Sequence, residues 1–101
     1  MTRLRLIQGG DAPTRLLERW FRDGRLVAIP ARRGKRIPVL DRLSQQFEVG
    51  VQYSEREVND ALAVFHPDVA ALRRYLVEEG FMARTPAGSR YWRTGGAVHI
   101  S

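Results

Sequence analysis

The 101-residue sequence contains no cysteine and only one lysine. Without cysteine the chain cannot form disulfide bonds, thiolate metal sites or a cysteine nucleophile. No apolar stretch approaches the roughly 18 residues of a membrane-spanning helix, and the apolar run at the start is too short for a secretory signal. Hydrophobic residues make up 44% and charged residues 28% of the sequence. These values predict one small soluble domain, which we expect in the cytoplasm and not at a membrane.

The positive charge is concentrated in the first third of the sequence. The formal net charge is +6, but residues 1–36 hold 10 basic and 3 acidic residues, whereas residues 37–101 hold 7 basic and 8 acidic residues. Four of the basic residues form a dense patch in the segment from Arg32 to Arg36. Such a patch attracts phosphate groups. The alternative is a solvated basic loop that only improves solubility.

The first part of the sequence predicts a helix followed by a short strand. Asp11 and Pro13 are typical of a helix start. Apolar residues then recur at helical spacing, and Gly24 is a common type of helix end. The apolar run over residues 26–29 predicts an edge strand that Pro30 closes. We expect residues 31–36 to form a basic loop.

The middle of the sequence predicts three more helices, with a short strand at residues 51–53 between the first two of them. The expected ranges are residues 37–47, 54–65 and 68–80. Ser54 and Glu57 have the spacing of a capping box, in which each side chain pairs with a backbone N–H at the helix start. Asp68 is positioned to cap the last helix.

The final segment predicts a β-hairpin with strands at residues 81–84 and 90–93. Two closely linked helices followed by a hairpin are typical of the winged helix-turn-helix. We therefore predict an α+β fold with a three-helix core, a C-terminal β-hairpin wing and an extra N-terminal helix. The predicted division is an N-terminal extension at residues 1–25, a winged-helix-like domain at 26–94 and a flexible tail at 95–101. The expected core residues are Leu40, Leu43, Phe47, Val58, Leu62, Phe65, Leu72, Leu76, Phe81 and Trp92.

Several sequence motifs carry a resemblance to a known family. They are the run from Ile29 to Arg36, the segments Tyr53–Asn59 and Leu72–Val77, and the triplet Tyr91–Arg93. In this order they resemble an uncharacterised bacterial family, the domain of unknown function 2087, over about residues 24–93. The resemblance implies a winged-helix-like fold in a family whose members occur alone or as C-terminal parts of bacterial transcriptional regulators. It implies no activity.

Basic residues from the early patch and from the hairpin predict a nucleic-acid contact dominated by the phosphate backbone, with DNA and RNA both possible. Residues 54–79 carry a net charge of −3, which disfavours base readout by the last helix. There, Arg74 is expected to face outward and Arg73 to be half-buried beside a carboxylate such as Glu57. The predicted contact residues are Arg32, Arg33, Lys35, Arg36, Arg74, Arg84, Arg90 and Arg93. The alternative for Lys35 and Arg36 is a structural pairing with Glu55 or Glu57.

The sequence gives little support for catalysis, a metal site or a cofactor. His66 stands beside Asp68, but this pair is more typical of a turn and a helix cap. We predict a small non-enzymatic regulatory protein that binds nucleic acid.

The alternative function is an adaptor that binds another protein, such as a transcriptional regulator or a ribosome-associated factor. Its candidate partner or dimer surface is the apolar stripe of Leu17, Trp20 and Phe21. The same stripe could instead cover the domain's own core. The sequence leaves the oligomeric state open.

Overall fold

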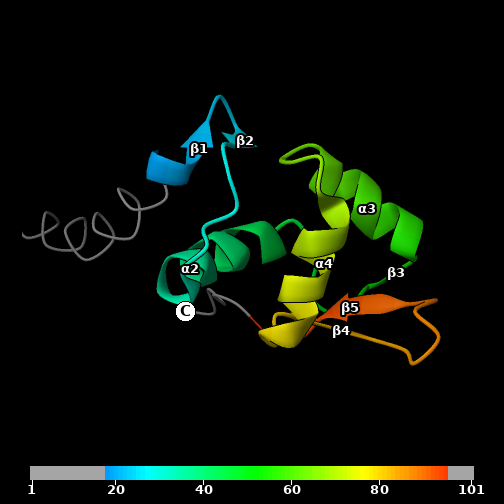
Figure 1. Ribbon diagram of the computed structural model, residues 1–101. Helices are drawn as coiled ribbons and strands as arrows, with labels where there is room; N and C mark the ends of the chain where they lie inside the picture. The colour runs from blue at the N-terminus through cyan, green and yellow to red at the C-terminus, as the bar shows by residue number, and fades with distance from the viewer. Residues whose placement is uncertain (1–17, 96–101) are drawn as a thin grey trace, which may run out of the picture.

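The computed structural model describes residues 18–95, which form short helices and short strands (Figure 1). The prediction of a mixed α+β fold is confirmed. The expected helix start at Asp11 and Pro13 lies outside the described residues. The elements are β1 (Phe21–Arg22), β2 (Arg25–Leu26), α2 (Arg33–Ser44), β3 (Gln52–Tyr53), α3 (Glu55–Ala63), α4 (Val69–Glu78), β4 (Met82–Arg84) and β5 (Tyr91–Arg93).

A small hairpin replaces the end of the predicted first helix. The helical residues stop at Trp20, and β1 pairs antiparallel with β2. Between the strands, Asp23 and Gly24 have φ values of 54° and 77°. Two successive residues with positive φ are typical of a tight hairpin turn of the type that Asp-Gly favours. The prediction that the helix reaches Gly24 was therefore wrong, because the turn at Asp23 and Gly24 prevails over the helical spacing of the apolar residues before it.

The N-terminal hairpin is attached to the turn between α3 and α4. The backbone N–H of Leu26 donates to the carbonyl oxygen of Phe65 at 2.8 Å. The rings of Phe21 and Phe65 meet edge to face, with centroids 6.3 Å apart. Leu26 is buried in the same core as the helices. These contacts make the hairpin part of the packed fold.

The helix α2 begins four residues earlier than predicted, at Arg33, and ends at Ser44. A helix that began at residue 37 would have Pro38 in its first turn, where the missing N–H donor is tolerated. In the structure Pro38 lies inside α2, one turn further on. The segment expected as a basic loop therefore contributes Arg33, Lys35 and Arg36 to the start of a helix.

The caps predicted for α3 and α4 are confirmed. The Ser54 hydroxyl accepts a hydrogen bond from the Glu57 N–H at 3.1 Å, and the Glu57 carboxylate accepts one from the Ser54 N–H at 2.8 Å. Asp68 accepts a hydrogen bond from the Ala71 N–H at 3.2 Å. The His66 ring nitrogen Nδ1 accepts one from the Asp68 N–H at 3.0 Å. His66 is thus part of the turn that starts α4.

The C-terminal strands form a three-stranded antiparallel sheet in the order β3-β5-β4. In its register Tyr91 of β5 lies opposite Tyr53 of β3 and Arg84 of β4. Tyr91 is only 3% exposed, whereas Trp92 is half-buried on the alternate position of the strand. The prediction that Trp92 fills the core was wrong, because strand alternation shows that one of two neighbours points inward but not which one.

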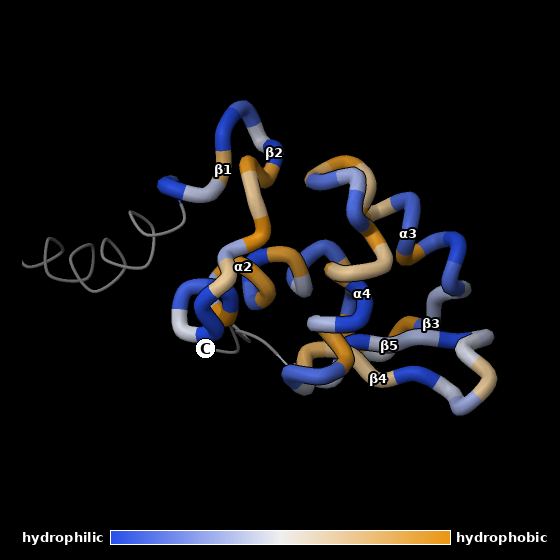
Figure 2. The backbone as a smooth tube through the Cα atoms, viewed as in Figure 1, coloured by the Kyte–Doolittle hydropathy of each residue, from blue (hydrophilic) through white to orange (hydrophobic). Residues whose placement is uncertain are grey.

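Apolar and hydrophilic stretches alternate along the helices, as the hydropathy colouring shows (Figure 2). The apolar positions of α2, α3 and α4 meet in one core with β2 and the sheet. Nine of the ten predicted core residues are buried, and Trp92 is the exception. The core comprises Leu26, Val39, Leu40, Leu43, Phe47, Val58, Leu62, Phe65, Leu72, Leu76, Phe81, Met82 and Tyr91.

Candidate nucleic-acid interface

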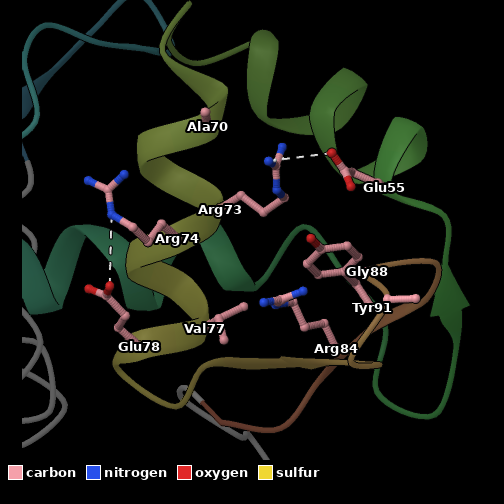
Figure 3. A pocket seen from close by; sticks show the side chains of 10 residues that line it. Glu55, Ala70, Arg73, Arg74, Val77, Glu78, Arg84, Gly88 and Tyr91 are labelled. Atoms are coloured by element: carbon pink, nitrogen blue, oxygen red, sulfur yellow. Dashed lines mark ion pairs between the residues drawn. The ribbon is translucent and has the colours of Figure 1, made fainter.

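A cleft of about 380 Å³ opens between α4, the start of α3 and the β4–β5 hairpin (Figure 3). Two of its arginines, Arg73 and Arg74, come from α4, and Arg84 comes from β4. Glu55 of α3 and Tyr91 of β5 line it as well. The close packing of α3 against α4, and of α4 against β4, brings these residues together although they are far apart in the sequence.

Arg73 is held in the cleft by two residues of α3. Its Nη1 atom donates to Asn59 Oδ1, and its Nη2 atom lies 3.4 Å from Glu55 Oε2. The Arg73 side chain is 20% exposed. The expectation of a half-buried arginine beside a carboxylate is confirmed, but the suggested partner Glu57 was wrong, because the Glu57 carboxylate caps α3.

Arg74 lies on the outer side of α4, as expected, and its side chain is 57% exposed. Its Nε atom is 3.8 Å from the Glu78 carboxylate, one helical turn further on. Exposed pairs of this kind contribute only about 0.3–0.5 kcal/mol. The Arg74 guanidinium is therefore readily available to another anion.

The hairpin contributes arginines in two different situations. Arg84 and Arg90 are exposed, and their guanidinium groups have no hydrogen-bond or ion-pair partner among residues 18–95. Arg93 instead donates from Nε to the Gly95 carbonyl at 2.9 Å and from Nη1 to the Phe47 carbonyl at 3.3 Å. Arg93 thus joins the sheet to the segment after α2, which leaves fewer of its donors for a ligand.

Two cations of the early patch have partners inside the fold. Arg33 donates to the Glu79 carboxylate, from Nη2 to Oε1 at 2.7 Å and from Nε to Oε2 at 2.9 Å. These hydrogen bonds are the main cause that lowers the pKa of Glu79 from its ordinary value of 4.5. They also raise the pKa of Arg33.

Arg36 is tied to the segment before α2 and to α4. Its Nη1 atom donates to the carbonyl oxygens of Ala31 at 2.8 Å and Pro30 at 3.2 Å. Its Cζ atom lies 4.2 Å from the ring centroid of Tyr75, and Arg74 Cζ lies 5.2 Å from the same centroid. The pairing of Arg36 with Glu55 or Glu57 that was considered is wrong, because Arg36 contacts backbone carbonyls and an aromatic ring instead.

Arg32 and Lys35 line a second hollow of about 320 Å³, together with Arg19 and Trp20. The side chains of Arg32 and Lys35 have no hydrogen-bond or ion-pair partner within the part described, 18–95. The start of α2 and the tip of the β4–β5 hairpin lie at opposite ends of the molecule in Figure 1. The early patch and the hairpin therefore do not form one continuous surface at Arg32 and Lys35, although Arg36 of the patch shares the Tyr75 ring with Arg74 of the cleft.

The apolar residues considered as a partner surface pack largely against the domain itself. Trp20 and Phe21 are half-buried and contact the core, and Leu17 lies outside the described residues. Among residues 18–95 no helix is long and apolar enough to span a membrane. The same part of the chain brings no three His, Asp or Glu side chains together as a metal site would require.

Comparison with known families found a family whose model matches most of the chain. The model of a family described as an uncharacterised protein conserved in bacteria, the domain of unknown function 2087, matches residues 25–93. The chain belongs to this family. Searches of curated proteins and of solved structures found no match.

Sequence reasoning missed several residues of the cleft. Glu55 was considered only as a partner for the early patch, and the expectation of Trp92 in the core left Tyr91 for the opposite face of the sheet. Asn59 was named only as part of a family motif, and Gly88 was given no role. Their roles depend on how α3 crosses α4 and on which face of β5 is buried, and neither has a local sequence signal.

Proposed function

We propose that the segment from α2 to β5 is a winged helix-turn-helix that binds nucleic acid. Support for the fold comes from the order helix, strand, two helices and hairpin, with the strand before α3 added to the hairpin edge as β3-β5-β4. In this arrangement α4 takes the position of the second helix of a helix-turn-helix, and the hairpin is the wing beside it.

One observation carries the proposed contact: arginines from α4 and from the hairpin line the same open cleft. Arg73, Arg74 and Arg84 supply three positive charges, against two negative charges from Glu55 and Glu78. Arg90 adds an exposed cation on the hairpin. Because guanidinium groups bind phosphate oxygens well, this surface is suited to the backbone of a nucleic acid.

The balance of charge favours weak binding with little sequence choice. Phosphate contacts position a nucleic acid without reading its bases. With a cleft excess of one positive charge, we expect dissociation constants of about 1–100 μM at physiological salt, the range of non-specific binding. Arg32 and Lys35, at the far end, are not part of this contact.

The test compares two charge-matched double variants. Fluorescence anisotropy with a labelled 20-base-pair DNA duplex, and with an RNA duplex of the same length, is measured across a salt series. The plot of the logarithm of the binding constant against the logarithm of the salt concentration has a negative slope. In Arg84→Gln/Arg90→Gln the magnitude of this slope should decrease by about 2, with affinity reduced at every salt concentration. In the control Arg32→Gln/Lys35→Gln the slope should be unchanged.

Equal effects of both double variants would show that the nucleic-acid contact is not centred on the hairpin. Absence of binding by the wild-type protein at low salt would overturn nucleic-acid binding altogether. A partner that survives nuclease treatment of a lysate would then favour the adaptor function.

A further inference from the structure

We infer that the cleft contains a subsite for one phosphate group, beneath the β4–β5 turn, with the Tyr91 hydroxyl and the guanidinium groups of Arg84 and Arg73 as donors. This inference deepens the proposed function and rests on it only for the source of the phosphate. The subsite itself rests on an unpartnered hydroxyl, a glycine and the charges around them.

Tyr91 has a hydroxyl group that the fold leaves without a partner. The residue is 3% exposed, and its oxygen makes no hydrogen bond within residues 18–95. Tyr91 nevertheless lines the cleft, and Figure 3 shows its hydroxyl pointing into the cleft on the side of Arg73. The ring of Tyr91 is buried, but its hydroxyl oxygen faces the open cleft, where its hydrogen-bond partner must come from water or from a ligand. A ligand oxygen in the cleft would provide one.

Gly88 keeps the space in front of this hydroxyl open. A Cβ atom at Gly88 would lie 3.3 Å from Arg84 Nη1, 3.7 Å from Glu55 Oε1 and 3.8 Å from the Tyr91 hydroxyl. Three polar groups from three elements therefore converge on one point. Gly88 has a φ of 73°, a conformation that side-chain-bearing residues rarely adopt.

The turn that carries Gly88 is held in place by its own hydrogen bonds. The Gly88 N–H donates to the Thr85 carbonyl at 2.8 Å. The Thr85 hydroxyl accepts from the N–H groups of Ser89 at 3.0 Å and Arg90 at 3.2 Å. These bonds order the turn before a ligand arrives, so that little entropy is lost on binding.

The charges around this point favour a tetrahedral oxyanion. Arg84 has no partner among residues 18–95, and Arg73 is fixed by Asn59. Several phosphate oxygens can accept from donors that approach from different directions. Glu55 competes for Arg73 at 3.4 Å, but its side chain is 46% exposed and can turn toward solvent when a phosphate enters.

The direct test is an NMR titration of the protein with inorganic phosphate, at constant ionic strength and with chloride as the reference anion. Saturable shifts are expected at the Gly88 amide and the Arg84 Nε–H. Tyr91→Phe removes only the hydroxyl and should weaken phosphate binding about tenfold. Arg84→Gln should abolish the shifts, whereas Arg90→Gln, on the same hairpin, should leave them unchanged.

Glu55→Gln should change the phosphate affinity in the opposite direction. It removes the carboxylate that competes for Arg73, and phosphate should therefore bind more tightly than to the wild-type protein. Melting temperatures of all variants show whether each is folded. Equal shifts with phosphate and chloride, or wild-type phosphate affinity in Tyr91→Phe, would overturn the inference.

The 20-base-pair duplex distinguishes the source of the phosphate. Weaker duplex binding by Tyr91→Phe, with an unchanged salt slope, indicates that a backbone phosphate occupies the subsite. Binding of inorganic phosphate without binding of the duplex supports the subsite and overturns the proposed function. Duplex binding that Arg84→Gln weakens but Tyr91→Phe does not overturns the subsite and supports the proposed function.

Discussion

Arg33 and Glu79, 46 positions apart in the sequence, join the start of α2 to the end of α4 through paired hydrogen bonds of 2.7 and 2.9 Å. The first turn of α2 contains no acidic residue of its own. An acidic residue there would favour the positive end of the helix dipole. Glu79 supplies a carboxylate to this turn from another helix.

The pair predicts a pH-dependent stability. Because Arg33 lowers the pKa of Glu79 below 4.5 in the folded state, the ionised carboxylate stabilises the fold above that value. This contribution is lost as the pH falls through the lower folded-state pKa. The melting temperature of Glu79→Gln should therefore lie below that of the wild type at pH 7, and the two should converge at acid pH, once the wild-type carboxylate is protonated. Thermal unfolding followed by circular dichroism at several pH values measures this.

Glu78→Gln is the matched control for the pH series. Glu78 neighbours Glu79, but within residues 18–95 it pairs only with Arg74, at 3.8 Å and in an exposed position. Its melting temperature should stay close to that of the wild type throughout. A difference between Glu79→Gln and wild type that is the same at pH 3 and pH 7 would contradict the role given to the pair.

Lysine cannot replace Arg36 without loss. The guanidinium contacts two carbonyl groups and the Tyr75 ring at once, and an ammonium group lacks this planar fork. Arg36→Lys should reduce the free energy of unfolding by about 1–2 kcal/mol in urea denaturation. Arg32→Lys, at an exposed position, should change it by less than about 0.5 kcal/mol. Similar values for both variants would argue against a structural role for Arg36.

Two glycines should respond in opposite directions to alanine. Gly24 has a φ of 77° in the turn between β1 and β2, so Gly24→Ala should destabilise the fold by about 1–2 kcal/mol. Gly34 lies in the first turn of α2, and a Cβ there meets nothing within 4 Å. Gly34→Ala should therefore stabilise the fold by about 0.5–1 kcal/mol. Urea denaturation measures both, and a shared sign would show that one of these backbone assignments is wrong.

Charge reversal should lower the melting temperature at two of the four early cations and not at the other two. Arg32→Glu/Lys35→Glu changes cations without partners among residues 18–95, and the melting temperature should stay near that of the wild type. Arg33→Glu/Arg36→Glu places one carboxylate opposite Glu79 and removes the contacts of Arg36. This second variant should melt several degrees lower. Equal melting temperatures would mean that the patch is not structural.

Local motifs explain what the sequence could predict. The capping box of Ser54 and Glu57 and the cap at Asp68 act within four residues, and the apolar spacing of the middle helices is regular. Both kinds of signal depend on neighbouring residues only. They located α3, α4, the C-terminal hairpin and most of the core.

The remaining features depend on contacts between distant segments. The early cations were expected to form one contact surface because they are adjacent in sequence. Arg33 instead forms an ion pair with Glu79, while Arg32 lines a separate hollow. The pairing of β5 with β3 and β4 decides which of the two side chains, Tyr91 or Trp92, points into the core. A one-residue change in that register would exchange the two faces. No pattern within either segment decides this.

Tyr75 connects the start of α2 with the cleft. Its ring receives Arg36 from one helix and Arg74 from its own, at 4.2 and 5.2 Å. The attraction of each guanidinium group to the aromatic ring offsets part of the electrostatic repulsion between these two positive charges. We therefore expect substitution of Tyr75 to change the affinity of the proposed anion contact in the cleft, although Tyr75 itself is not a proposed ligand.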